Sequence, residues 1–169
     1  VMGWKAAEAF NSGGGTNDAK SNTLIGRSVL QNSATAYYNT AVGYGAMQFV
    51  KTDGDNDPHS NVAIGYHAGE GITTGSDNVL IGREAGDAVT TADQNTIIGK
   101  EAATSMTTGS NNTCLGFGAL TTSTTDTANT AVGDSSLYTL DGGDYNTAIG
   151  YLSLRLATTA DNCTAAGYN

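Results

Sequence analysis

One short phrase recurs along the chain at a fixed interval, and this periodicity restricts the fold more than any other property of the sequence. The phrase is clearest at residues 39–47, which read NTAVGYGAM, and it returns further along as NVAIG, NTIIG, NTCLG and NTAIG. The fifth residue of each copy is a glycine, which we call the motif glycine, and from Gly65 to Gly167 successive motif glycines are 17 residues apart. Repeats of this length predict a solenoid, in which each repeat forms one coil and stacks on the next.

The array extends over the whole chain and is expanded in two places. We interpret residues 1–169 as a single array of about ten repeats, with expanded turns at residues 11–21 and 48–60. Insertions in repeat proteins form loops on one face, which is often the binding face, so the second expanded turn is a candidate contact site. Both ends of the sequence fall inside a repeat, and we therefore expect a segment of a longer protein.

Seventeen residues are too few for a strand followed by a crossover helix of ordinary length. Within each repeat we expect two short strands, one ending at the motif glycine and one beginning after it. A turn rich in Thr, Gly, Ser and Asn then leads to the next repeat. The predicted class is all-β, and the predicted architecture is a parallel β-solenoid, either a β-roll or a triple β-helix.

Two adjacent positions of the repeat are apolar, although neighbouring residues of a strand point to opposite sides of it. A single coil can cover only one side, so we expect another chain to cover the other. This predicts an oligomer, most simply a cyclic one about the long axis. The position before the motif glycine forms a column that we predict to be buried: Ile25, Val42, Ile64, Ile81, Ile98, Leu115, Val132 and Ile149.

The composition excludes some classes of partner. The net charge is −9, and the seven basic residues are spread over the chain, which argues against binding to nucleic acid. No apolar run approaches the roughly 20 residues of a membrane-spanning helix, so we expect no membrane insertion.

The phrases NTAVGYGAM, NTCLGFGAL and NVAIGYHAG resemble the Asn-Thr-Ala-Ile-Gly-x-x-Ala-Leu repeats of phage tail fibres and of the heads of trimeric autotransporter adhesins. The resemblance covers nearly the whole chain, and the 17-residue spacing with Thr-Thr-Gly-Ser-Asn turns is more similar to the viral version. It implies three chains about one axis and a role in attachment outside the cell, on a virion or a bacterial surface. The expected partners are two further copies of the chain and a host cell-surface glycan or protein receptor.

The repeated asparagines are the most regular polar feature. We interpret them as an internal ladder, in which each side-chain amide hydrogen-bonds the next rung and tolerates the tight turn. A ligand-binding array is the alternative. The predicted ladder residues are Asn22, Asn39, Asn61, Asn78, Asn95, Asn112, Asn129 and Asn146.

The second expanded turn has carboxylates at alternate positions, Asp53, Asp55 and Asp57, which is the spacing that opens a calcium-binding loop. Pro58 stands where an EF-hand has glycine, and Ile64 stands where it has glutamate. The alternatives are therefore a non-standard calcium site and a solvated acidic loop. Calcium is the one cofactor that the sequence raises.

Threonine recurs at the start of the apolar pair and in the turns, and regular threonine files on a flat solenoid are also typical of ice-binding proteins. β-Propensity and turn chemistry explain the same threonines without a ligand. Aromatic residues after the motif glycine, such as Tyr44 and Phe117, are candidates for stacking on sugar rings. We predict no enzymatic activity, because neither His59 nor His67 lies near a Ser or Cys nucleophile motif.

The sequence therefore predicts a structural and adhesive segment of a homotrimeric fibre that mediates attachment to a host cell. Its origin would be a phage tail fibre or a related virion appendage. The alternatives are the head of a bacterial trimeric adhesin and an ice-binding β-solenoid.

Overall fold

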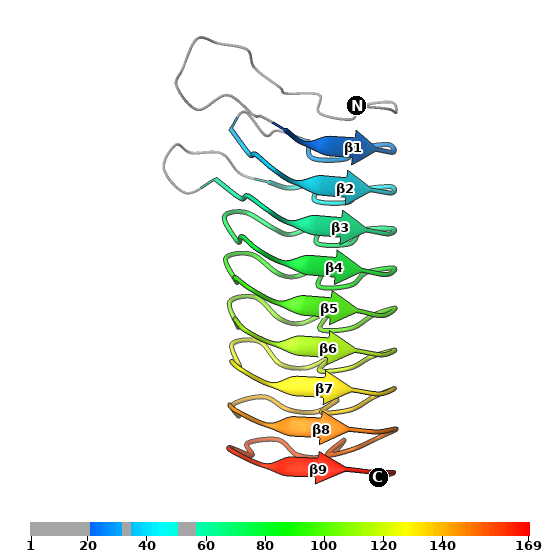
Figure 1. Ribbon diagram of the computed structural model, residues 1–169, viewed down its shortest axis with the longest axis vertical. Helices are drawn as coiled ribbons and strands as arrows, with labels where there is room; N and C mark the ends of the chain where they lie inside the picture. The colour runs from blue at the N-terminus through cyan, green and yellow to red at the C-terminus, as the bar shows by residue number, and fades with distance from the viewer. Residues whose placement is uncertain (1–20, 32–34, 51–56) are drawn as a thin grey trace.

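The computed structural model describes residues 21–31, 35–50 and 57–169. Within these ranges the chain forms a rod of stacked coils, and the strands lie one below the next along it (Figure 1). The predicted parallel β-solenoid with a 17-residue repeat is confirmed. The described strands are β1 (Thr23–Ile25), β2 (Thr40–Val42), β3 (Val62–Ile64), β4 (Val79–Ile81), β5 (Thr96–Ile98), β6 (Thr113–Leu115), β7 (Thr130–Val132), β8 (Thr147–Ile149) and β9 (Thr164–Ala166).

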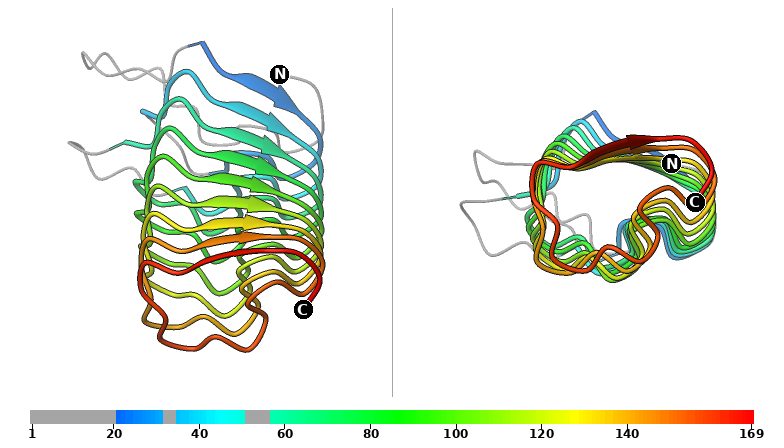
Figure 2. Two further views of the ribbon diagram at one scale, coloured as in Figure 1. Left: turned by 60° about the horizontal axis from the view of Figure 1, so that its bottom comes forward. Right: turned by 90° about the horizontal axis from the view of Figure 1, so that it is seen from below.

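These strands form one parallel sheet whose order follows the sequence from β1 to β9. The pairing register equals the repeat, so Thr96 of β5 lies beside Thr113 of β6, and Ile98 lies beside Leu115. Equivalent residues of successive repeats therefore form straight columns along the rod. Viewed along the rod, the sheet occupies one side of a closed outline, and the turns complete the other sides (Figure 2).

The core fills the inside of the coil. The middle residue of each strand points inward, and from the turn wall fully buried side chains such as Leu120 and Leu137 complete the interior. Removal of these apolar groups from water is the main favourable contribution to folding. The buried strand column is Leu24, Ala41, Ala63, Leu80, Ile97, Cys114, Ala131 and Ala148.

The predicted second strand of each repeat is wrong, since none is present among the described residues. Two and four positions after the motif glycine the backbone adopts a positive φ, for example +56° at Glu101 and +49° at Ala103. Strands require a negative φ, so this wall is a run of turns. Neighbouring rungs are still joined there: Glu101 N–H donates to the Arg83 carbonyl and Ala103 N–H donates to the Ala119 carbonyl, both at 2.9 Å.

The expanded turns are described only in part. Of the first, residues 11–20 lie outside the described ranges, and the second is described at residues 48–50 and 57–60. Where the chain rejoins the regular rungs, Tyr37 and His59 form an isolated parallel bridge. In the described portion of the chain, no helix has the length and apolar character needed to cross a membrane.

Candidate functional site

The motif asparagines form the predicted internal ladder, and they are buried in every rung except that of Asn22. In the central rungs, Asn95 Nδ2 donates to Asn78 Oδ1 at 3.1 Å and to the Gly109 carbonyl at 2.9 Å. The backbone N–H of Asn95 donates to the same Asn78 oxygen at 2.9 Å. Cys163 takes the asparagine position in the last rung. These contacts use the polar atoms of the amides inside the rod, so we assign the column a structural role and not a ligand-binding one.

The motif glycines and the turn threonines form two further columns in which each rung contacts the next. The motif glycines lie where successive coils approach closely, and a methyl group on Gly99, whose φ is +146°, would overlap the Gly116 carbonyl. In the turns, Thr90 Oγ1 donates to the Thr107 carbonyl at 3.0 Å. The regular glycines and turn threonines of the sequence therefore hold the coils together.

The column that we predicted to be buried lies on the outside of the coil. Side chains at Ile25, Leu115 and Ile149 are 44%, 42% and 47% exposed. The strand alternates and the neighbouring column occupies the interior, so the single chain leaves this column uncovered, and its burial against another chain stays a prediction. The outer strip, as we call this column, runs along the rod on the open face of the sheet and consists of Ile25, Val42, Ile64, Ile81, Ile98, Leu115, Val132 and Ile149.

Beside the outer strip, the position after the motif glycine faces solvent. The rings of Tyr44 and Tyr66 stack with their centres 5.5 Å apart and their planes 12° apart. The Arg27 guanidinium lies 5.6 Å from the centre of the Tyr44 ring, and the Lys100 ammonium lies 5.3 Å from that of Phe117. Each of these ring faces is turned along the rod toward its neighbour, which leaves mainly ring edges for an external ligand.

Only one of the three predicted calcium ligands can be placed. Asp53 and Asp55 lie outside the described residues, whereas Asp57 is described and half-buried. Its Oδ1 is shielded from solvent and has no hydrogen-bond partner among the described residues. Nowhere in the described ranges do three or more His, Cys, Asp or Glu side chains form a group suited to a metal ion. The calcium site stays a prediction from the sequence.

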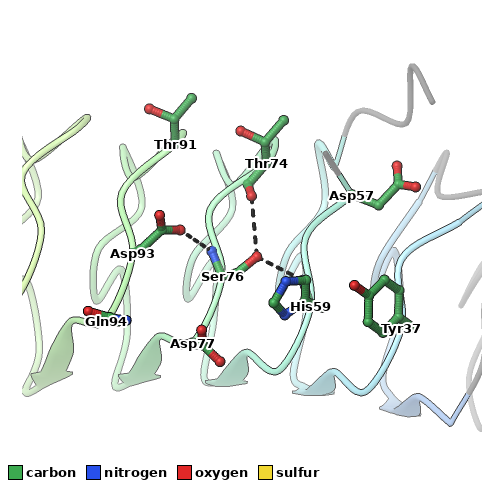
Figure 3. Close-up of a pocket in the computed structure, with 9 residues that line it drawn as sticks. All are labelled: Tyr37, Asp57, His59, Thr74, Ser76, Asp77, Thr91, Asp93 and Gln94. Atoms are coloured by element: carbon green, nitrogen blue, oxygen red, sulfur yellow. Dashed lines mark hydrogen bonds between the residues drawn. The ribbon is translucent and has the colours of Figure 1, made fainter. Parts of the chain in front are cut away.

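Asp57 lines a polar groove of about 450 Å³ at the side of the rod where the strands begin (Figure 3). The stacked rings of Tyr37 and His59, with centres 5.0 Å apart and planes 23° apart, form part of its lining. Ser76 and Asp93 belong to the two following rungs, and Ser76 N–H donates to Asp93 Oδ1 at 2.7 Å. We call this hollow the corner groove.

Asp77 and Gln94 extend the corner groove along the rod. Each immediately precedes a ladder asparagine and has a φ of +60°, and both side chains are exposed. Asp77 and Gln94 are 17 residues apart, so the repeat length alone indicates that they lie in one column of the rod. Tyr37 and His59 are 22 residues apart. The sequence reasoning missed the groove because it did not place these two rings in adjacent rungs.

A second hollow of about 330 Å³ lies among the turns, lined by Glu84, Glu101 and Tyr138 among others. Asp87 also lines it, and burial is the main reason that the pKa of this carboxyl is raised. Arg83 lies 3.0 Å from Glu84 and 3.7 Å from Glu101, so a cation offsets part of the negative charge. The hollow therefore offers a ligand fewer unpaired carboxylates than the corner groove.

Comparisons of the chain with models of protein families, with curated proteins and with solved structures found no match. The outer strip and the corner groove are therefore the two features from which we infer a function.

Proposed function

We propose that this chain is a segment of a homotrimeric fibre that attaches a virion, most simply a phage through its tail fibre, to the surface of a host cell. The observation that carries the proposal is the outer strip. Its apolar side chains are exposed on a regular sheet in the single chain, with exposures up to 47% at Ile149.

Monomeric soluble proteins rarely expose a long contiguous apolar surface, because burying it in a contact is favourable. The side chains of the outer strip recur once per rung in register, for example Ile98 beside Leu115 and Val132 beside Ile149. Three copies of the same strip facing a common axis would therefore meet along the whole rod. A closed cyclic arrangement also leaves no free edge that would recruit further chains.

Such a trimer suits attachment because it is rigid and repetitive. Three identical copies raise the effective concentration of each binding surface at a cell wall or membrane, where receptors are dense. The same assembly would serve the alternative function, the head of a trimeric adhesin on a bacterium. Both alternatives place the protein outside the cell and give it host-surface molecules as partners.

Multi-angle light scattering on the purified segment tests the proposal. We expect three times the chain mass of 17.1 kDa. Ile98→Asp would place a charge in the apolar contact and should yield monomers. Thr125→Asp, on an exposed turn position away from the sheet, is the matched control and should stay trimeric. A stable, soluble monomer of the unmodified chain would overturn the proposal.

One observation favours ice binding as a second candidate. Thr113, Thr130 and Thr147 follow one another in register on the same outer face of the sheet. Val62 and Val79 interrupt this file near the other end. The two functions compete for one face, because a trimer would cover the threonines. A monomer that shapes ice crystals in a nanolitre osmometer would favour the second candidate, and a trimer without that activity would favour the first.

A further inference from the structure

We infer that the corner groove binds a neutral saccharide. This inference deepens the proposed attachment function and rests on it, since it assigns the receptor site and the chemical class of the receptor. Asp57 and His59, which line the groove, belong to the second expanded turn, and an insertion in a repeat protein is often a binding feature. Its volume of about 450 Å³ suits a short saccharide, because ligand sites typically measure ~300–1,000 Å³.

The aromatic wall of the groove provides the apolar part of the site. Tyr37 and His59 stack on each other at 5.0 Å, so two adjacent rungs together place two aromatic rings in the lining of the groove. The C–H face of a sugar ring is apolar and carries slight positive charge, which suits packing against an aromatic ring, whose face is negative. The rings after the motif glycines also stack along the rod, but none of them lines the corner groove.

The polar wall of the groove provides acceptors for sugar hydroxyls. Asp93 uses Oδ1 to accept the Ser76 N–H at 2.7 Å, and this bond leaves Oδ2 for a ligand. Asp57 also lines the groove, but its Oδ1 is shielded from solvent, so Asp93 is the carboxylate that we assign to the ligand. Ionised carboxylates only accept hydrogen bonds, whereas the Gln94 amide both donates and accepts. Hydroxyl groups, which donate and accept, complement this combination.

The charge of the groove decides between neutral and acidic saccharides. Asp57, Asp77 and Asp93 all line it, and no Lys or Arg is among its described lining residues. A sialylated or sulfated glycan would meet like charge here without a compensating cation. The same three carboxylates do not form a metal-binding group among the residues that the structure describes. A neutral polyhydroxylated ligand fits the groove best.

The groove and the outer strip occupy different parts of each rung. Asp77 and Gln94 precede the ladder asparagines, whereas the outer strip is formed by the last residue of each strand. Self-association through the strip and saccharide binding at the groove therefore use separate side chains. Three chains would present three grooves at the same level of the rod.

The test begins with an array of immobilised oligosaccharides that contains neutral hexose and N-acetylhexosamine chains beside their sialylated and sulfated counterparts. The best neutral oligosaccharide is then titrated into the protein by calorimetry. We expect binding to neutral members only, and at least tenfold weaker binding for Asp93→Asn, Gln94→Ala and Tyr37→Ala.

The repeat provides matched controls. Asp144 occupies the same column as Asp93, and its Oδ1 accepts the Thr127 N–H at 2.7 Å, but it lies outside the groove. Asp144→Asn should therefore bind the saccharide as the unmodified chain does. Ala128 stands in the column of Gln94, so alanine is compatible with the backbone at that position.

The outcomes separate this inference from the proposed function. If the chain is a trimer that binds no neutral saccharide, or binds it equally after the groove substitutions, the groove assignment is wrong and the fibre proposal stands. If the chain is a monomer whose saccharide binding is lost with the groove substitutions, the fibre proposal is wrong and the groove assignment stands. Preference for the sialylated or sulfated members, or binding of calcium chloride alone through Asp93, would also overturn the assignment.

Discussion

Asn95 and Asn78 lie one rung apart, and a single oxygen of Asn78 accepts two hydrogen bonds from Asn95. The side-chain Nδ2 donates to Oδ1 at 3.1 Å, and the backbone N–H donates to it at 2.9 Å. Both side chains are buried. The contact therefore fixes the position of one coil on the next at a site that water does not reach, and equivalent contacts recur along the rod.

The first prediction concerns this ladder. Asn95→Ala would remove the donor to the Gly109 carbonyl and the acceptor of the Asn112 N–H, which is 2.8 Å away. Buried polar groups left without partners cost about 1–3 kcal/mol each, so we expect the loss of these two partners to cost about 2–6 kcal/mol. In thermal unfolding followed by circular dichroism, the midpoint should fall by at least ~4 °C.

The neighbouring Asn111 provides the control, because it is exposed and has the same positive φ as Ala128 in the next rung. Asn111→Ala should change the free energy of unfolding by less than about 1 kcal/mol. If Asn95→Ala melted at the same temperature as Asn111→Ala, the ladder would have no special role in stability.

The second prediction separates two reasons for the motif glycines. Gly99 and Gly167 share a similar backbone, with φ of +146° and +138°. A Cβ on Gly99 would overlap the Gly116 carbonyl, whereas a Cβ on Gly167 would have no atom within 4 Å. Gly99→Ala should therefore add a steric clash to the backbone strain and destabilise the protein by more than about 3 kcal/mol.

Gly167→Ala should show only the backbone strain, about 1–2 kcal/mol. Urea unfolding of both variants at one protein concentration measures the difference. Equal losses in the two variants would mean that the close approach of the coils contributes nothing beyond the local conformation.

Periodicity predicted much of the fold, but it could not choose the inner side of the strand. The ladder and the parallel register follow from the 17-residue spacing, since equal positions must form columns. Both positions of the apolar pair, Ile97 and Ile98 for instance, are hydrophobic, so alternation did not distinguish them. The structure buries Ile97 fully and leaves Ile98 half-buried on the outer face.

The turn wall and the corner groove were harder to predict for local reasons. Glu101 and Leu120 adopt positive φ although neither residue favours it, and the packing of neighbouring rungs overrides their propensity. The corner groove depends on Tyr37 meeting His59 across an irregular stretch of 22 residues. Each of the two residues stands two positions before a ladder asparagine, so the repeat register places them in adjacent rungs, but it does not predict that their rings stack beside a hollow.

The third prediction uses two alanines three positions apart. Ala128 has a φ of +58° and is half-buried, so glycine there would relieve backbone strain. Allowing for the greater freedom of unfolded glycine, Ala128→Gly should stabilise the protein by about 0.5–1 kcal/mol. Ala131 lies in β7 and is fully buried. Ala131→Gly should destabilise by at least a similar amount, because it adds flexibility and removes a packed methyl group.

The melting temperatures of the two variants test this prediction. They should shift in opposite directions, upward for Ala128→Gly and downward for Ala131→Gly. A downward shift for both would show that the positive φ at Ala128 carries no strain that glycine relieves.

The last prediction concerns the two thiols. Cys114 is fully buried in the strand column, and burial raises the pKa of its thiol to about 12. Cys163 is only half-buried. Because the thiolate is the reactive form, dithiobis-nitrobenzoate at pH 8 should modify Cys163 in the folded protein and Cys114 only after unfolding. Rapid modification of both thiols in the folded state would contradict the burial of Cys114.

The raised pKa of Cys114 also makes stability depend on pH. In the unfolded chain the thiol ionises near its ordinary value of about 9, whereas in the folded chain it stays protonated until about pH 12. The unfolded state therefore binds fewer protons between these values, and stability falls as pH rises through that window, by up to about 1.4 kcal/mol per pH unit. Cys114→Ala is the matched control, because Ala131 and Ala148 occupy the same buried column in the following rungs. Urea unfolding at a series of pH values should show a steeper decline between pH 9 and pH 11 for the unmodified chain than for Cys114→Ala, and parallel curves would contradict the assignment.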